Sequence, residues 1–353
     1  MKLEEELQNH TWQPLPSTAF VVTEPKIREI FAADFRDRIV HHLLYNYLVP
    51  IWESKFIFDS YACRKGKGTH KASVKRLYQF LRKITKNGRE NAFCFQGDVK
   101  SFFTSINHDI LYQLVQKYVK NPDILWLCKT IIYHDPTKNH IKRGQQNLFN
   151  KVPPDKSLFH IPKGQGLPIG NITSQFFANV YLNELDQFVK HHLKVKYYIR
   201  YVDDFVILRQ NPEILKKWRK QIDQFLRKNL ALKLHPKKQK IFPVNQGIDF
   251  LGYIIKLSHI LNRKRVVKAL KNKLWHFNQK ILGMNLEHPI RLWTPELCQD
   301  FQKIFGAVNS YYGMFKHANA YRLRRHIYEK HFDILKVYLI PANKKYSHFI
   351  WDE

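Results

Sequence analysis

The sequence predicts an α+β fold, in which short β-prone runs lie between amphipathic helices. Its two clearest β-prone runs, 91–103 and 197–208, are separated by a long helical pattern, and another helical pattern follows the second run. Hydrophobic residues make up 44% of the 353 residues, so the chain can bury a sizeable core. Because the sequence has neither an internal repeat nor a Gly/Ser-rich linker, we expect a globular protein of two or three lobes.

The first part of the chain predicts helices that lead into one β-prone run. Apolar spacing, turn residues and the Asn87-Gly88 pair set the expected boundaries. These elements are one or two helices over 26–52, a Gly- and base-rich loop over 60–72, a helix over 71–85, a β-prone run over 91–103 and a helix from about residue 107.

The second part predicts one more β-prone run and a basic, helical end. Helical and β-prone patterns alternate here, after a Pro/Lys-rich stretch over 138–163. The expected elements are a helix over 171–193, a β-prone run over 196–209, a helix over 212–232, short strands around 241 and over 250–255, and a basic helical region over 263–338.

The charge of the chain predicts a polyanionic partner. Lys and Arg number 59 against 29 Asp and Glu, a formal net charge of +30 that no single tail carries. Nucleic acid fits this distribution better than a membrane surface, and no run approaches the roughly 18 apolar residues of a membrane span. An acidic N-terminus without an apolar segment and four scattered cysteines without a C-x-x-C pair predict a soluble, cytoplasmic protein.

Two adjacent acids interrupt the apolar run Ile199–Leu208, IRYVDDFVIL. The β-prone residues on both sides predict a tight hairpin that carries Asp203 and Asp204 at its turn. Asp is also common in ordinary turns. The flanking residues are unusually apolar for a surface hairpin, however, and a second β-prone run upstream ends in Asp98.

An Asp at the end of a buried strand can face a hairpin Asp across a sheet. Asp98, Asp203 and Asp204 would repel one another there unless divalent cations bind, and hard carboxylate oxygens suit Mg²⁺. Two Mg²⁺ ions about 3.5–4 Å apart stabilise the attacking and leaving oxygens of a phosphoryl displacement. The three acids therefore predict a nucleotidyl-transfer site.

Four motifs resemble the palm motifs of reverse transcriptases, in the same order and at similar spacing. They are DVKSFF (98–103), GQGLPIGNITSQ (164–175), YVDDF (201–205) and FLGY (250–253). The resemblance covers about residues 35–255 and implies a right-hand polymerase that makes DNA on an RNA template. It further implies an N-terminal extension over 1–30, mainly fingers over 31–97, the palm with part of the fingers over 98–255, and a helical, basic thumb over 256–353.

The resemblance also assigns roles around the acids. Asp98, Asp203 and Asp204 match the metal-binding triad, with the Val99 carbonyl as an additional ligand of two Mg²⁺ ions, which Mn²⁺ can replace. Phe103 matches the ring that excludes a ribose 2′-hydroxyl and so selects dNTPs. A plain core aromatic remains the alternative for Phe103.

Basic residues on two loops match family residues that act on the triphosphate. Arg64 and Lys65 resemble the fingers residues that hold it, and Lys67 and Lys71 in the same loop resemble them or contact nucleic acid. Lys237 or Lys238, with Lys240 also open, lies where the family keeps a lysine that protonates the pyrophosphate. The alternatives are a solvated basic loop at the first site and a structural role at the second.

One motif departs from the usual Q-G-x-x-x-S-P pattern of reverse transcriptases. Ile169 replaces the Gln, Gly170 is kept, and Gln175 replaces the Pro. Ile169 cannot hydrogen-bond the nucleotide, so selection there rests on shape, which discriminates weakly. Together with SYACRKGKGTH (60–70) and SYYGMFKHANAYRLR (310–325), this pattern resembles the reverse transcriptases of diversity-generating retroelements.

That resemblance implies a template-repeat RNA, cDNA mutated at template adenines and a small helical accessory protein. The alternatives are reverse transcriptases of group II introns, retrons or phage defence, of which the intron type is expected to carry further domains. A non-catalytic RNA-binding protein with a polymerase-like fold would be expected to have lost some of the acids, and all three are present.

The C-terminal region mixes aromatic and basic residues that could follow an RNA–cDNA heteroduplex or unpaired template. A helical bundle with a solvated basic face is the alternative. The expected nucleic-acid contacts in this region are Arg263, Lys264, Arg322, Arg324 and Arg325.

Overall fold

A computed structural model describes residues 2–24, 26–282 and 295–351 of the chain, which divide into two compact units. Unit 1 comprises residues 1–68 and 93–242, and unit 2 comprises residues 69–92 and 243–353. Residues 69–92, which we expected within the fingers, therefore group with the C-terminal part of the chain. The assignment of fingers, palm and thumb to residue ranges stays a prediction.

A four-stranded sheet in the order β5-β6-β3-β7 positions the acids in unit 1. β6 pairs antiparallel with both β5 and β3, so the two acid-bearing runs of the sequence are neighbours. The strands are β3 (Phe93–Asp98), β5 (Tyr197–Tyr201), β6 (Asp204–Arg209) and β7 (Lys240–Pro243). This arrangement confirms the predicted hairpin and the predicted strand that ends in Asp98.

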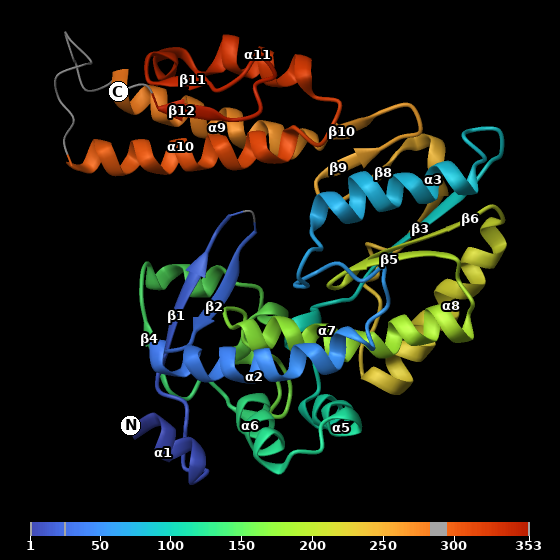
Figure 1. The fold of residues 1–353 in the computed structure, drawn as a ribbon, viewed down its shortest axis with the longest axis vertical. Helices are drawn as coiled ribbons and strands as arrows, with labels where there is room; N and C mark the ends of the chain where they lie inside the picture. Colours follow the sequence, from blue (N-terminus) through green and yellow to red (C-terminus); the bar gives the residue numbers. More distant parts are fainter. Residues whose placement is uncertain (1, 25, 283–294, 352–353) are drawn as a thin grey trace. The chain divides into compact units, whose positions relative to one another are not determined.

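Helices pack around this sheet and form one hydrophobic core with it. α8 packs against β3 and β6, while α7 packs against α2, α5 and α8 (Figure 1). α7 is buried on most sides, and its buried residues include polar ones such as Thr173, Asn179 and Asp186 beside the apolar ones. The helices of unit 1 are α1 (Lys2–Gln8), α2 (Phe35–Glu53), α4 (Phe102–Ser105), α5 (His108–Tyr118), α6 (Pro122–Tyr133), α7 (Ile172–Gln187) and α8 (Pro212–Leu230).

A second sheet in unit 1 corrects the helix that we predicted over 26–52. Residues Arg28–Ala32 form β2, which pairs antiparallel with β1 (Ser17–Val22), and β4 (His140–Lys142) pairs parallel with β1. The helix starts only after Asp34, whose carboxylate accepts a hydrogen bond from Arg36 N at 2.9 Å. The prediction was wrong here because strand pairing with residues distant in sequence overrides the local pattern.

Unit 2 contains the predicted helix over 71–85, which begins as a π-helix, η1 (Lys71–Leu77), and continues as α3 (Tyr78–Ile84). The strand expected over 250–255 is instead a hairpin. Leu251 and Gly252, with φ of 51° and 89°, form its turn. The sheet is β8 (Ile248–Phe250), β9 (Tyr253–Ile255) and β10 (Ile260–Asn262), in the order β10-β9-β8.

In the part of unit 2 that the structure describes after β10, three helices and a short hairpin share their own core. They confirm the helical pattern predicted after Arg263, except that residues 283–294 lie outside the described residues and that the closing hairpin was not predicted. The elements are α9 (Lys264–Leu282), α10 (Pro295–Phe315), α11 (Tyr321–His331), β11 (Leu339–Pro341) and β12 (Phe349–Trp351).

Short helical turns complete the described structure: the 3-10 turns η2 (Gln146–Lys151), η3 (Pro154–Lys156), η4 (Leu158–His160), η6 (Val244–Gln246) and η7 (Asp333–Val337), and the π-helical turn η5 (Phe188–His192). Across residues 2–24, 26–282 and 295–351, we find no helix with the length and apolar character needed to cross a membrane.

Candidate active site

The turn between β5 and β6 brings the two adjacent acids to the end of the strand that carries the third. Tyr201 pairs with Asp204 around the two-residue turn Val202–Asp203, and Asp204 also lies opposite Asp98 in the β3–β6 register. Val202 has a φ of 53°. A β-branched residue rarely adopts this left-handed conformation, so the turn stores backbone strain.

Gly97 allows β3 and β6 to pack closely beside the acids. A Cβ atom at this position would overlap the ring of Phe205, the residue opposite Gly97 on β6. Any larger residue would push that ring away and disturb the register of Asp98 and Asp204. The glycine of the motif FQGDV is therefore needed for packing.

Mutual repulsion of the acids shows in their protonation equilibria. Burial and the charge of Asp98 raise the pKa of Asp203 to about 6. Burial and the charges of Asp203 and Asp98 raise the pKa of Asp204 to about 7. The three carboxylates thus form one interacting group, and a cation beside them would relieve the cost of ionising them.

Lys238 provides one positive charge beside the three acids. Its Nζ lies 2.6 Å from Asp98 Oδ2, whereas the buried Asp98 Oδ1 has no hydrogen-bond partner among the described residues. The described residues hold no cluster of three His, Cys, Asp or Glu side chains already arranged around a metal position. The unpartnered oxygen of Asp98 and the raised pKa values of Asp203 and Asp204 are what a binding site for a divalent cation would show. Lys238 lies on one side of the three acids.

Sequence reasoning missed a buried ion pair that supports the hairpin. Arg200 and Asp186 are both fully buried, and Arg200 Nη2 lies 2.6 Å from Asp186 Oδ2. Arg200 Nη1 donates at 2.9 Å to the carbonyl of the strained Val202, and Tyr198 Oη donates at 2.7 Å to Asp186. The available signal was an Arg within a buried strand pattern and an Asp within an apolar helix.

Backbone hydrogen bonds anchor two of the residues predicted to contact the nucleotide, Phe103 and Ile169. Phe103 is half-buried, and its carbonyl accepts from Leu167 N at 2.8 Å, while the adjacent Phe102 is buried in the core. The carbonyl of Ile169 accepts from Phe31 N at 2.8 Å, which attaches the loop to β2. Gly170 has a φ of 141°, and a Cβ there would come within 2.5 Å of the Phe31 carbonyl oxygen.

The loop that follows α2 meets the start of α7 through Cys63 and Gln175. The Cys63 thiol donates to Gln175 Oε1 at 3.1 Å, so two segments with the same family resemblance are in contact. In this loop Lys65 is exposed, and Lys67 Nζ donates to the Phe58 carbonyl at 2.8 Å.

The structure places Arg64 differently from the prediction. Its side chain is only 7% exposed, and Nη2 lies 2.6 Å from Glu53 Oε2. Nη1 donates to the carbonyls of Ile57 and Ser60 at 2.7 and 2.9 Å. This geometry favours a role in holding the loop rather than a direct contact with a triphosphate.

The remaining residues predicted to contact nucleic acid, Lys71 among them, belong to unit 2. Arg322 is exposed, and Arg325 pairs with Glu329 at 2.6 Å. Arg263 Nε donates to Asp249 Oδ1 at 2.6 Å. Arg324 is 7% exposed, so its burial does not fit the predicted contact with nucleic acid. Tyr312 and Phe315 are buried in the core, as the bundle alternative predicted.

Three interacting carboxylates on an antiparallel sheet, in a chain of net charge +30, define a polymerase of the right-hand class. The chain belongs to the family described as reverse transcriptase (RNA-dependent DNA polymerase), whose model matches residues 23–255. The match includes all four motifs and the three acids.

Several proteins of known sequence are similar to this chain. Protein YkfC of Escherichia coli is 27% identical over 297 residues, covering 74% of this chain and 71% of YkfC. The group II intron-encoded protein LtrA of Lactococcus lactis is 22% identical, covering 77% of this chain and 52% of LtrA. Nuclear intron maturase 1 of Arabidopsis thaliana is 24% identical, covering 66% of this chain and 42% of the maturase. The chain thus spans about half the length of LtrA and less of the maturase.

Solved structures with some likeness include two telomerases. Telomerase of Candida albicans, in complex with a fragment of telomeric RNA, has a TM-score of 0.48 at 12% identity, covering 90% of this chain and 58% of the telomerase. Apo telomerase of Candida tropicalis has a TM-score of 0.49 at 11% identity, covering 84% of this chain and 52% of the telomerase. These scores are too low to support an argument.

Proposed function

We propose that this chain polymerises DNA on an RNA template. The observation that carries the proposal is the register of Asp98 opposite Asp204, with Asp203 in the adjoining turn. Such a group of acids is suited to hold divalent cations and to act on a nucleoside triphosphate. The basic surface of the chain would hold the RNA template and the RNA–cDNA heteroduplex.

Mg²⁺ fits the donor set of this site. Asp98, Asp203, Asp204 and the carbonyl of Val99 are the residues that we propose hold two ions, and Mn²⁺ is expected to substitute. When bound, the ions supply charge stabilisation for phosphoryl transfer. The residues of the chain fix the position of the carboxylates, chiefly through β-sheet register and the Arg200 contact with the hairpin.

Lys238 is the proposed proton donor to the pyrophosphate. Both lysines are exposed, but the ammonium group of Lys238 lies at Asp98, whereas Lys237 contacts its loop through its backbone N, which donates to His235 Nδ1 at 3.2 Å. A primary ammonium group can transfer a proton to a phosphate leaving group, which is general acid catalysis. The position of its Nζ favours Lys238 among the lysines that the sequence left open.

Nucleotide selection is proposed to combine a ring, a loop and an exposed basic side chain. In this proposal the ring of Phe103 excludes a ribose 2′-hydroxyl, and Lys65 contacts the triphosphate. Ile169 and Gly170 form one wall of the site that receives the nucleotide. Gln175, which is exposed and accepts from the Cys63 thiol, is proposed to take part as well. The ion pair of Arg64 with Glu53 supports an indirect role for Arg64.

Primer extension on an RNA template tests the proposed activity. The Asp204→Asn variant keeps the shape of the side chain but removes its charge, so dNTP incorporation should fall by about a thousandfold or more while RNA binding persists. The matched control is Asp123→Asn on α6, which removes an exposed carboxylate that pairs with His10, outside the acid-bearing sheet. Full incorporation by Asp204→Asn would overturn the proposal.

We further propose that the chain serves a diversity-generating retroelement, with a small helical protein as its partner. Support comes from Ile169 and Gln175 in place of the usual Gln and Pro, and from the contact of Gln175 with Cys63. An apolar side chain at position 169 gives little polar discrimination between template–nucleotide pairs, which favours copying errors.

A group II intron function is the second candidate, because two of the similar proteins are named for introns. Deep sequencing of cDNA made on a mixed-sequence RNA template separates the two. Errors concentrated at template adenines support the retroelement proposal, whereas uniform errors at a low rate favour the intron type.

A further inference from the structure

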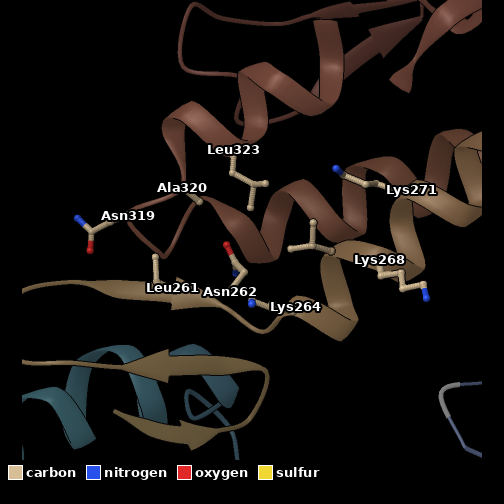
Figure 2. A pocket seen from close by; sticks show the side chains of 9 residues that line it. Leu261, Asn262, Lys264, Lys268, Lys271, Asn319, Ala320 and Leu323 are labelled. Atoms are coloured by element: carbon tan, nitrogen blue, oxygen red, sulfur yellow. The ribbon is translucent and has the colours of Figure 1, made fainter. Parts of the chain in front are cut away.

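A pocket outside the proposed active site lies within unit 2. It has a volume of about 380 Å³, within the range of roughly 300–1,000 Å³ that is common for small-ligand sites. Strand β10 and helices α9 and α11 contribute its walls (Figure 2). The lining residues are Leu261, Asn262, Lys264, Val267, Lys268, Lys271, Asn319, Ala320 and Leu323.

Asn262 is the unusual residue of this pocket. It is only 8% exposed, and its buried Oδ1 and Nδ2 both lack a hydrogen-bond partner among the described residues. Figure 2 shows the carboxamide rising from β10, with its oxygen turned toward Ala320 and Leu323. A buried amide without partners costs stability, so an apolar residue would serve the fold better.

Asn319, the other residue of the pocket with a carboxamide, differs from Asn262 because its side chain has a hydrogen-bond partner. Asn319 Oδ1 accepts a hydrogen bond from Ile260 N at 2.8 Å, and the Asn319 N donates to the Ile260 carbonyl at 2.8 Å. Asn319 therefore has a structural role that fixes the loop before α11 to β10. Asn262 has a backbone partner in Tyr253 through the β9–β10 ladder, but its side chain has no such role.

Positive charge surrounds this unpartnered amide. Lys264, Lys268 and Lys271 come from successive turns of α9, and no carboxylate is among the described lining residues. α11 begins at the pocket, and its N-cap residue, Ala320, provides no side-chain hydrogen bond to the first-turn amides. Uncapped helix amides and lysines both favour an anion.

We propose that this pocket binds a single nucleotide of a nucleic acid strand. The Asn262 carboxamide offers one donor and one acceptor side by side, which matches the paired donor and acceptor at the edge of a nucleobase. Leu261, Val267 and Leu323 provide apolar contact for the faces of the base. The lysines and the start of α11 hold the adjacent phosphate.

The inference rests on the proposed function only in that a polymerase brings a nucleic acid strand to the chain. An acidic peptide would satisfy the lysines, but it would leave the amide of Asn262 and the apolar walls without a matched group. The chemistry of the pocket therefore favours a nucleotide over a peptide.

Equilibrium binding of two probes tests this site on the full chain without dNTPs or metal. One probe is a fluorescein-labelled octamer of oligoadenylate, and the other has the same backbone with every base removed. In the Asn262→Leu variant we expect the preference for the base-bearing octamer to fall by at least about fivefold. The melting temperature should not fall, since a buried unpartnered amide has been removed.

The lysines should act through the phosphates instead. A Lys264→Gln/Lys268→Gln variant is expected to weaken binding of both octamers by the same factor. The slope of log K against log salt should become shallower by about 0.7 for each lysine. Lys273→Gln, which removes a charge from α9 outside the pocket, is the matched control and should leave both the affinities for the octamers and the salt slope unchanged.

Two results would overturn the proposal. One is an unchanged base preference in Asn262→Leu, which includes equal weakening of both octamers, and the other is displacement of the octamer by polyglutamate but not by AMP. Because the measurement is of binding alone, it separates the two proposals. Wild-type protein that binds as expected but extends no primer would contradict the proposed function and leave the pocket standing.

Discussion

Val202 has a backbone conformation that β-branched residues avoid, and the buried side chain of Arg200 contacts its carbonyl at 2.9 Å. Arg200 is in turn neutralised by Asp186. The position of the two hairpin acids thus depends on a charge pair buried beneath them. Burial of such a pair does not by itself stabilise a fold, because desolvation offsets the attraction, so a role in positioning explains it better.

Removing one partner of this pair should lower the free energy of unfolding more than removing both. Asp186→Leu leaves an unpaired buried guanidinium and is expected to cost about 3–5 kcal/mol of unfolding free energy. Adding Arg200→Met should recover much of this stability while kcat for dNTP incorporation stays low and KM changes little. Urea denaturation and steady-state kinetics measure the two effects. Recovery of kcat together with stability would contradict a positioning role for Arg200.

Phe103 is half-buried and follows Asp98 by five positions in the sequence, which suits the proposed ring that contacts the sugar of the nucleotide. In Phe103→Ala, the ratio of kcat/KM for dNTPs over rNTPs should fall about tenfold or more, because a space opens for the 2′-hydroxyl. Phe103→Tyr keeps the ring and should keep the ratio. An unchanged ratio in Phe103→Ala would return this residue to the core alternative.

At the scale of single residues, the sequence predicted the three acids but not the buried residues that hold the hairpin in place. Asp98, Asp203 and Asp204 stand out because each interrupts or ends an apolar run. Arg200 and Asp186 lie fourteen positions apart on different elements, and nothing in the sequence pairs them. Asn262 gives no signal either, since its lack of partners is visible only in three dimensions.

The contact between α2 and α7 contains a buried imidazole. His41 Nδ1 lies 2.7 Å from Thr173 Oγ1, and burial lowers the pKa of His41 to about 4, with smaller contributions from His134 and His42. Between about pH 6.5 and pH 4, the unfolded chain binds a proton at this residue that the folded chain does not. The stabilisation is therefore complete above pH 6.5 and is lost as the pH falls toward 4.

This imidazole should contribute roughly 3 kcal/mol to the loss of unfolding free energy between pH 7 and pH 4. His41→Gln should remove that share of the pH dependence, which urea denaturation at several pH values measures. The same substitution at exposed His191 is the control for the loss of an imidazole. Equal pH profiles of His41→Gln and wild type would contradict the burial argument.

The loop before α7 depends on Gly170 because of its backbone angle and its contact with β2. Gly170→Ala should cost about 1–3 kcal/mol or more, since a Cβ meets the Phe31 carbonyl in an unfavourable conformation. Gly144 also has a positive φ, of 77°, but open space around it, so Gly144→Ala should cost only about 1 kcal/mol. Thermal denaturation compares the two variants, and equal losses of stability would contradict the predicted overlap of a Cβ at position 170 with the Phe31 carbonyl.

Elements that form from neighbouring residues were predictable, and those that depend on distant partners were not. The helices α3 and α8 follow from apolar spacing and their flanking turn residues. β2 looks helical in sequence, but it is a strand because β1 pairs with it. The turn at Leu251–Gly252 escaped prediction because a Leu rarely takes a positive φ.

The whole molecule combines a small acidic centre with a surface of opposite charge. Its net charge of +30 would hold a polyanionic strand. The repulsion among the three acids would be relieved by cations bound beside them, not by the distant surface charge. Charge and motif order predicted the class of protein at this scale. The sequence predicted two or three lobes but not the boundary between the two units, because residues 69–92 group with a segment far away in the chain.

The most direct test of the central claim is the product that the purified chain makes on a primed RNA template with Mg²⁺. The account predicts a DNA strand complementary to the RNA, made from dNTPs, sensitive to DNase, absent when EDTA is present and absent with Asp203→Asn. A chain that binds the primed RNA but makes no such strand, or that makes it equally well as Asp203→Asn, would contradict the account.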